Sequence, residues 1–290
     1  MLSHKLRVTI TLGNEDRFAS SGKNTIIIDN LRVIAGITQF GGQTTGTANV
    51  SIYGMLESDM NQVTTLSTDN YTTEQKPFLR QHSILIEADG SPVFDGIITN
   101  AWGMYQMQPD VYLHIEANEL FLHKVTPLEP TSIKGVVQVA DIFKHFADIM
   151  KLNFENNGVD MIDDDVALVG SAWEQAAEYA KHCKIELAHE GRTLIINRRG
   201  QARQGKIPLI NEKTGLVGYP SFDTFGVSFK SLFNPAIRFL GLVRIETPIK
   251  RADGEFRVQM IKLLLESEKP GGAWFMDCRA IPAFLAPQKA

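Results

Sequence analysis

The sequence predicts a mainly β protein of the α+β class, in which two β-barrel-like domains flank a small α/β domain. Apolar and polar residues alternate over the first 125 positions, as they do in half-buried strands. Between about 136 and 183 the period becomes that of an amphipathic helix, and beyond about 206 the alternation returns. We therefore predict domains over residues 1–130, 131–203 and 204–290.

The first domain contains short alternating segments separated by turn residues. These predicted strands lie at Leu6–Leu12, Ile26–Phe40, Ala48–Tyr53, Ser83–Ala88, Val93–Thr99 and Val111–Ala117. Asp89 and Gly90 predict a tight hairpin, because both residue types tolerate the positive φ angles that such turns require. Gly54 ends one strand before a short polar segment of helical character. The strands together indicate a curled sheet or a barrel.

A polar, threonine-rich insertion over about 62–78 interrupts this domain. An insertion of this length in a compact β-domain is usually either functional or disordered. Two interpretations are open: a solvated surface loop, or a protruding loop that contacts a neighbouring protein.

The second domain is predicted to follow a linker, Thr126–Lys134, which contains Pro127 and Pro130. Apolar residues then recur at helical spacing and predict a helix over about Val136–Lys151. An Asn-Gly pair marks the turn after it.

Ser171 and Glu174 predict a second helix, because the two side chains can cap the free amides of its first turn reciprocally. This helix is expected over Ala172–Cys183. A hairpin around a Glu-Gly turn follows, with strands at Ile185–Ala188 and Thr193–Asn197. Two helices and a hairpin make a small α/β unit.

The third domain resumes the strand pattern after a polar stretch. Its predicted strands lie at Phe225–Phe229, Leu242–Glu246, Phe256–Ser267 and Trp274–Ile281. Aromatic residues are dense in its first part, at Phe222, Phe225, Phe229, Phe233 and Phe239. They could alternate into a barrel core, or they could form an exposed subunit interface, where aromatic residues are also enriched.

Composition and charge describe an ordinary globular protein. Apolar residues make up 43% and charged residues 21% of the 290 positions, and the net charge is −4. Tight binding of nucleic acid normally requires a basic stripe, and the one short basic cluster consists of Arg198, Arg199, Arg203 and Lys206. We therefore expect no sequence-specific binding of nucleic acid, although DNA could still pass by.

The cysteine pattern and hydropathy bear on the cellular compartment. Cys183 and Cys278 are far apart and neither belongs to a CxxC pair, which indicates reduced thiols in a protein made in the cytoplasm. No apolar run reaches about 18 residues, so we expect neither a signal peptide nor stable membrane insertion.

Metal-binding patterns are incomplete. The acidic run Asp163–Asp165 cannot form an EF-hand, because Leu168 stands where the loop requires glycine. His182, Cys183 and His189 could supply three zinc ligands, but no fourth ligand is apparent. We predict no metal site.

Catalytic and cofactor motifs are incomplete as well. The loop GGQTTG lacks the Lys-Ser/Thr pair of a P-loop and runs into a strand. No GxSxG elbow is present, and Ser221 follows a proline in a predicted turn. Glu186 and Glu190 could act on a glycosidic bond only if a cleft held them apart on its two sides. We predict no catalytic residue and no cofactor.

Three stretches of the sequence jointly carry a family resemblance. They are LRVIAGITQFGGQTTGTANVSIYGMLESDMNQVTTL (Leu31–Leu66), SAWEQAAEYAKHCKIELAHEGRTLIINRRG (Ser171–Gly200) and GLVGYPSFDTFGVSFKSLFNPAIRFLGLVRIE (Gly215–Glu246). In order and separation they resemble the baseplate or tail hub proteins of tailed bacteriophages. That group includes the hubs of contractile tails, the phage late control protein D family and, more distantly, the VgrG spikes of type VI secretion.

The resemblance implies a structural protein without enzymatic activity. Such hubs are homotrimers whose two tube domains per chain give a pseudo-sixfold ring. The ring would join the tail tube protein to a spike, tip or other baseplate protein and enclose the channel through which DNA passes. The protein would then be located in the virion, at the tail baseplate, after synthesis in the host cytoplasm.

In that setting the insertion at about 62–78 would contact a neighbouring subunit or the tail tube. The candidate contact residues are Thr64, Asp69, Tyr71 and Phe78. The alternative from another class is a glycan-binding or cell-wall-hydrolysing tail-tip protein. It would require clustered exposed aromatic residues or a carboxylate pair in a cleft.

Overall fold

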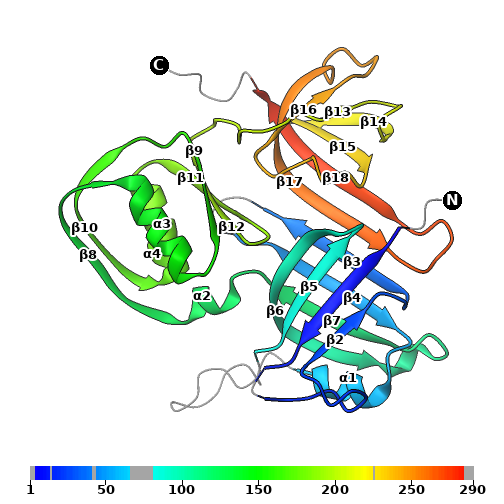
Figure 1. Ribbon diagram of the computed structural model, residues 1–290. Coiled ribbons are helices and arrows are strands. Elements are labelled where there is room, and N and C mark those ends of the chain that lie inside the picture. The colour runs from blue at the N-terminus through cyan, green and yellow to red at the C-terminus, as the bar shows by residue number, and fades with distance from the viewer. Residues whose placement is uncertain (1–3, 14, 41–43, 66–80, 225, 284–290) are drawn as a thin grey trace. The chain divides into compact units, whose positions relative to one another are not determined.

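The computed structural model describes residues 4–13, 15–40, 44–65, 81–224 and 226–283 (Figure 1). The chain is mainly β, as the sequence predicts, and it divides into two compact units. The first unit comprises Met1–Thr38, Gly46–Glu119 and Leu263–Phe275, and the second comprises Gln39–Thr45, Leu120–Lys262 and Met276–Ala290. The division into domains at 130/131 and 203/204 stays a prediction.

Among its described residues, the first unit contains seven strands from the N-terminal part of the chain. They are β1 (Leu6–Thr11), β2 (Thr25–Ile28), β3 (Val33–Gln39), β4 (Thr47–Tyr53), β5 (Ser83–Ala88), β6 (Ser91–Met104) and β7 (Tyr112–Asn118). Their order is β3-β4-β7-β6-β5-β1-β2, and β17 (Gly254–Glu266) lies next to β3. No pairing among the described strands closes this sheet into a barrel.

The alternation of apolar residues fixes the register of this sheet. Val50 and Ile52 of β4 lie opposite Ile115 and Leu113 of β7, and all four side chains are fully buried. A slip of one residue would turn this apolar set outward, so the pattern specifies a single pairing.

Glycine and aspartate form the turns that the sequence predicts. Asp89 and Gly90 have φ angles of 48° and 80° and connect β5 to β6. Gly54 has a φ of 76° and ends β4 before helix α1 (Glu57–Val63). The predicted strand, glycine break and short helix are therefore confirmed.

The returning segment of β17 completes the first unit at the edge of β3. The amide of Ser267 donates to the carbonyl of Val33 at 3.0 Å, and the Ser267 hydroxyl donates to the carbonyl of Leu31 at 3.1 Å. The Arg32 guanidinium donates to Glu266 at 2.9 Å. Although burial alone raises the pKa of Glu266, Arg32 and Lys269 hold it below its ordinary value.

The second unit begins with an α/β part. Its elements are α2 (Phe121–Val125), β8 (Pro127–Gln138), α3 (Val139–Ile149), β9 (Asn153–Asn157), β10 (Ile162–Ser171), α4 (Ala172–His182), β11 (Ile185–Glu190) and β12 (Thr193–Arg198). Strands β8 and β10 form an antiparallel ribbon, and β11, β12 and β9 form a mixed three-stranded sheet. Figure 1 shows α3 and α4 between this ribbon and this sheet.

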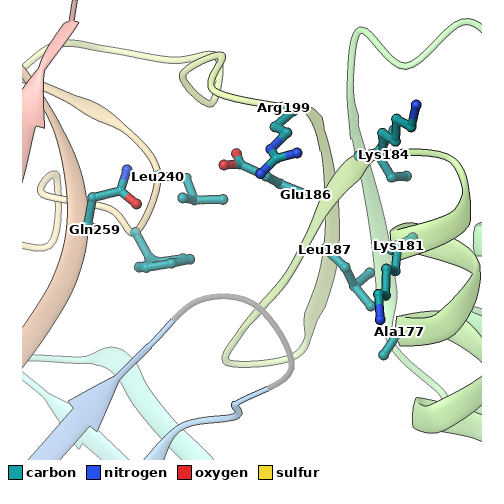
Figure 2. A pocket seen from close by; sticks show the side chains of 11 residues that line it. Ala177, Lys181, Lys184, Glu186, Leu187, Arg199, Leu240 and Gln259 are labelled. Carbon is teal, nitrogen blue, oxygen red and sulfur yellow. The ribbon is translucent and has the colours of Figure 1, made fainter. Parts of the chain in front are cut away.

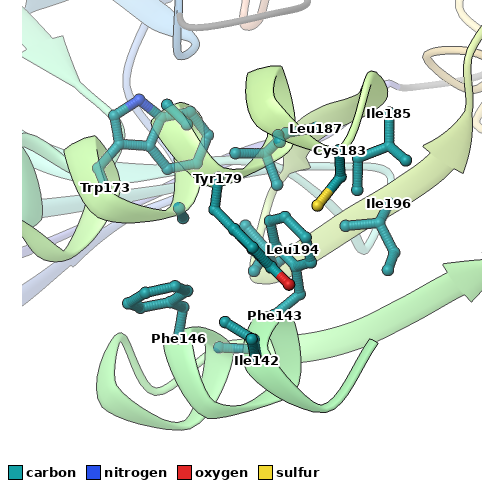
Figure 3. Packing of buried hydrophobic residues seen from close by; sticks show 14 of the residues in the cluster. Ile142, Phe143, Phe146, Trp173, Tyr179, Cys183, Ile185, Leu187, Leu194 and Ile196 are labelled. Atoms are coloured by element: carbon teal, nitrogen blue, oxygen red, sulfur yellow. The ribbon is translucent and has the colours of Figure 1, made fainter. Parts of the chain in front are cut away.

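The apolar faces of α3 and α4 form the core of the α/β part (Figure 3). Phe143 of α3 and Tyr179 of α4 lie with ring centroids 5.3 Å apart. Leu194 and Ile196 of β12 are fully buried against the helices. Burial raises the pKa of the Tyr179 hydroxyl, and it also raises that of the neighbouring Cys183 thiol.

The second helix begins at the predicted capping box. The Glu174 amide donates to the Ser171 hydroxyl at 3.3 Å, and the Ser171 amide donates to the Glu174 carboxylate at 2.9 Å. That backbone bond and the bond to the Ser171 side chain lower the pKa of Glu174. The predicted hairpin after this helix is also confirmed.

The predicted linker at Thr126–Lys134 is wrong. Most of these residues belong to β8, and the helix expected from Val136 begins at Val139. Among the described strands, β8 pairs with β10 alone, and most of its side chains are exposed. Its amino-acid composition therefore resembles that of a loop. Proline is tolerated on such an edge, because the ladder does not need every amide.

The remaining strands of the second unit form its second β part. They are β13 (Leu209–Ile210), β14 (Leu216–Asp223), β15 (Gly226–Leu232), β16 (Leu242–Ile245), β17 as far as Lys262, and β18 (Trp274–Pro282) from Met276. Their order is β14-β15-β18-β17, with β16 on β17 and β13 on β16. Strands β13 and β14 are additional to the predicted set.

Some aromatic residues of this part lie in its core and others are exposed, so both roles considered for them, core packing and a subunit interface, are still open. Phe229 and Phe239 are buried, whereas Phe222 is 48% exposed and Phe233 is half-buried. Phe225 lies outside the described residues. The pattern therefore contributes to a core and also leaves an aromatic side chain on an outer strand.

Neither cysteine is paired with the other. Cys183 and Cys278 are buried free thiols, and burial raises the pKa of Cys278 to about 12. None of the helices described is long and apolar enough to cross a bilayer.

Candidate functional site

Six charged side chains of the second unit form ion pairs that include two buried arginines. We call this group the charged seam, and it consists of Glu155, Glu186, Glu190, Arg203, Arg238 and Arg257. The three glutamates come from β9 and β11 of the α/β part. The three arginines come from the segment that follows and from β17. The charged seam therefore connects the two parts of this unit.

Arg203 occupies the centre of the charged seam. Its guanidinium donates to both carboxylate oxygens of Glu155, at 2.6 and 2.7 Å, and also to Glu190. Its side chain is only 2% exposed. Arg238 donates to Glu155 at 3.0 Å, and the amide of Phe239 donates to Glu190 at 3.0 Å.

Arg257 makes the second contact of the charged seam. It extends from β17 and donates to both oxygens of Glu186, one of them at 3.3 Å. Its side chain is 1% exposed. Planar guanidinium groups suit such two-point contacts with carboxylates, and a buried charge is tolerated only when it is paired in this way.

A pocket adjoins the charged seam, with a volume of about 520 Å³. Helix α4 and strand β11 line one side, and Phe239, Leu240 and Gln259 line the other. Figure 2 shows Arg199 and Glu186 projecting into the space that faces Leu240 and Gln259. We call this space the seam pocket.

The charged seam holds its groups in ion pairs. Glu186 and Glu190, the sequence candidates for an acid pair, are each bonded to a buried arginine. Each carboxylate is therefore neutralised by a fixed cation. Among the described residues no group of three or more His, Cys, Asp or Glu side chains is placed to hold a metal ion.

The other acidic residues and the possible metal ligands named from the sequence do not belong to the charged seam. Asp163–Asp165 belong to β10, where Asp165 occupies a bulge and accepts a hydrogen bond from the amide of Gly135 at 2.8 Å. His182 is exposed and lies 3.4 Å from Asp163, whereas Cys183 and His189 are buried.

The structure places one of the four candidate contact residues. Thr64 ends α1, and both its amide and its hydroxyl donate to the carbonyl of Met60 at 2.9 Å. Asp69, Tyr71 and Phe78 lie outside the described residues. Their role as a contact surface stays a prediction.

The charged seam was not predicted from the sequence. The sequence groups Arg203 with Arg198, Arg199 and Lys206 as a basic cluster, but in the structure Arg203 is buried and paired, whereas Arg199 is exposed. Charge alone does not distinguish a buried arginine from a solvated one. The glycines and short apolar segments on either side of Arg203 do not indicate that it is buried.

Comparison with protein families gives a match over most of the chain. Residues 5–270 match the model of the family described as Baseplate hub gp41. A search of curated protein sequences found no match to this chain.

Solved structures of tail proteins have a similar fold. The prophage MuSo2 43 kDa tail protein from Shewanella oneidensis is 11% identical, with a TM-score of 0.63, over 99% of this chain and 100% of that one. A tail protein from Neisseria meningitidis MC58 is 11% identical, with a TM-score of 0.61, over 95% and 96%. At these identities the likeness shows the fold alone.

A secretion protein shares this fold as well. The E. coli c3393 protein is 8% identical, with a TM-score of 0.57, over 87% of this chain and 73% of that one. It is described as a component of the type VI secretion system that is structurally similar to the T4 bacteriophage tail proteins gp27 and gp5.

Proposed function

Because this chain belongs to the Baseplate hub gp41 family, we propose that it forms a homotrimeric ring between the tail tube and the central spike or tip of a phage baseplate. The ring would enclose the channel through which DNA passes. The observation that carries this proposal is the family match over residues 5–270. The sequence resemblance to phage tail hubs is confirmed at the level of the family.

Unpaired sheet edges support an assembly of several copies. Among the described strands, β2 ends the sheet of the first unit and β14 ends that of the second. Both carry exposed apolar side chains: Ile27 is 59% exposed, Tyr219 75% and Phe222 48%. An edge of this kind is a template for further pairing, and a closed ring of copies would cover it.

We infer that the protein acts without catalysing a reaction, as part of the virion after synthesis in the host cytoplasm. The neutralisation of Glu186 and Glu190 by arginines supports this over a glycan-hydrolysing role. Hydrolysis would need one carboxyl group to donate a proton and the other to stay available to water or sugar.

The insertion is the proposed contact with a neighbouring subunit or with the tail tube. Thr64 is its first candidate residue and is held at the end of α1, and Asp69, Tyr71 and Phe78 are the others. A loop that extends from a rigid element is a common way to present a binding surface.

Solution mass and imaging test the proposed function. Light scattering after gel filtration should give three times the 32.3 kDa of one chain. Negative-stain images should show rings with a central hole. A monomer at every protein concentration tested, together with compact solid particles, would contradict the proposal.

A further inference from the structure

We propose that the seam pocket binds an extended peptide segment of a partner protein, in which a carboxylate side chain stands next to a large apolar one. This inference rests on the proposed function, because it gives a tail assembly protein a specific point of attachment. It depends on three properties of the pocket: its size, its apolar walls and the sign of its polar groups.

The size and the walls suit a short piece of polypeptide. A volume of about 520 Å³ lies within the range of roughly 300–1,000 Å³ that is usual for ligand pockets. Ala177 and Ala180 of α4 and Leu187 of β11 give one apolar wall, and Phe239 and Leu240 give the other. These five side chains are packed against the rest of the second unit and are largely buried. The two apolar walls of the pocket are therefore in place before a ligand binds.

The charged groups at the pocket favour an anion. Lys181, Lys184 and Arg199 line it, and all three are exposed. Among the described residues that line it, Glu186 is the one acidic residue, and its carboxylate is already bonded to Arg257. The charge that remains for a ligand to balance is therefore positive.

The side chain of Gln259, on the wall that Phe239 and Leu240 also form, requires an acceptor as well. The side-chain nitrogen of Gln259 is buried and has no hydrogen-bond partner among the described residues. Lysine and arginine side chains donate hydrogen bonds and cannot accept them. A ligand that presents carboxylate oxygens would satisfy these donors, and bonds to ionised groups are the stronger kind.

A peptide fits this combination better than other anions do. A nucleic acid would stack its bases on aromatic side chains, and within the described lining of the pocket Phe239 is the one aromatic residue. A free phosphate would leave the apolar walls without a partner. An acidic residue beside a leucine or phenylalanine satisfies both features at once, as peptide-binding grooves commonly require.

An octapeptide array provides the test. Its central positions vary over Asp, Asn, Leu and Gly, and the full-length protein is the labelled probe. Sequences that combine Asp with Leu should retain the protein about tenfold better than those with Asn in place of Asp or Gly in place of Leu. Equal retention of the Asn and Asp sequences would overturn the proposal, as would retention of none.

Three variants assign the binding to the seam pocket. Arg199→Glu and Lys184→Glu reverse exposed charges at the pocket, and Gln259→Leu removes the buried donor; each should lower retention of the Asp-Leu peptides at least fivefold. Lys144→Glu on α3 is the matched control, because it is an exposed lysine away from the pocket and should leave retention unchanged. Equal retention by Arg199→Glu and the parent protein would overturn the proposal.

Two further measurements distinguish peptide binding by the seam pocket from simple anion binding and from the proposed trimeric ring. Inorganic phosphate at millimolar concentration should leave peptide retention unchanged, and full displacement would show a simple anion site and overturn the peptide proposal. Solution mass is measured on the same preparations. A trimer that retains no peptide contradicts the pocket alone, whereas a monomer that retains the Asp-Leu peptides supports the pocket and contradicts the ring.

Discussion

Arg203 shows how much one residue can contribute to connecting two parts of a chain. Its guanidinium binds Glu155 and Glu190 at once, and its side chain is almost completely shielded from water. A charge in that position is stable only while its partners remain. Glu155 and Glu190 are in turn held by Arg238, so the cluster acts as a network.

Replacement of Arg203 by alanine should lower the free energy of unfolding by about 3–5 kcal/mol, because it leaves two carboxylates without their buried partner. Arg203→Lys should recover only part of the loss, since an ammonium group cannot make the two-point contact. Urea denaturation followed by circular dichroism measures both changes. Arg251→Ala, at an exposed arginine, is the control, and an equal effect there would contradict the role of Arg203.

His123 should make stability depend on pH. Burial, with further contributions from His189 and Lys151, lowers its pKa below the ordinary 6.5. The unfolded chain therefore takes up a proton first as pH falls. The stability contribution is complete above pH 6.5 and is lost as pH decreases from 6.5 towards the folded pKa.

Replacement of His123 by glutamine should accordingly reduce the decrease in the urea midpoint between pH 7 and pH 5. Midpoints measured at half-unit intervals test this. The exposed His145→Gln is the matched control and should keep the parent's pH dependence. A His123→Gln curve parallel to that of the parent would contradict the assignment.

At the scale of elements, the sequence predicts those segments whose signals are local. Ser171 and Glu174 fix the start of α4, and Asp89 with Gly90 fixes a hairpin, because each signal operates within a few residues. The sequence does not predict strand β8, for the converse reason. Its side chains are mostly exposed, so it has no apolar periodicity, and its strand conformation depends on pairing with β10 some thirty residues later.

The capping box of α4 should contribute measurably to the stability of the α/β part. Ser171→Ala removes the acceptor for the Glu174 amide and should cost about 1 kcal/mol, with a range of roughly 0.5–2 kcal/mol. Thermal or urea unfolding measures the change. Ser171→Asp keeps an acceptor at the same position and should restore most of the loss, and a variant no better than alanine would contradict this role.

At the scale of the whole molecule, the sequence predicts the class of fold and, through resemblance, the family. It does not predict that residues 263–275 return to the first unit, or that the charged seam forms. Both features bring together residues that are far apart in the chain. Alternation and capping describe one segment at a time, so they carry no information about such pairings.

The exposed aromatic side chains of β14 should be necessary for the proposed ring. Tyr219→Lys combined with Phe222→Lys places charges on an edge strand, which is how edge pairing is commonly prevented. Light scattering should then give the mass of one chain in place of three. Leu56→Lys changes an equally exposed apolar residue at the start of α1 and should leave the mass unchanged; a trimer in the double variant would contradict this role for β14.

The return of residues 263–275 to the edge of β3 has a consequence for synthesis on the ribosome. Val33 and its bonding partner Ser267 leave the exit tunnel far apart in time: at about 5–20 residues per second, roughly 10–50 s separate them. During that interval the nascent β3 has no neighbour on that side. The first unit therefore stays incomplete until residue 275 has been made, and it must avoid adhering to other nascent chains in the meantime.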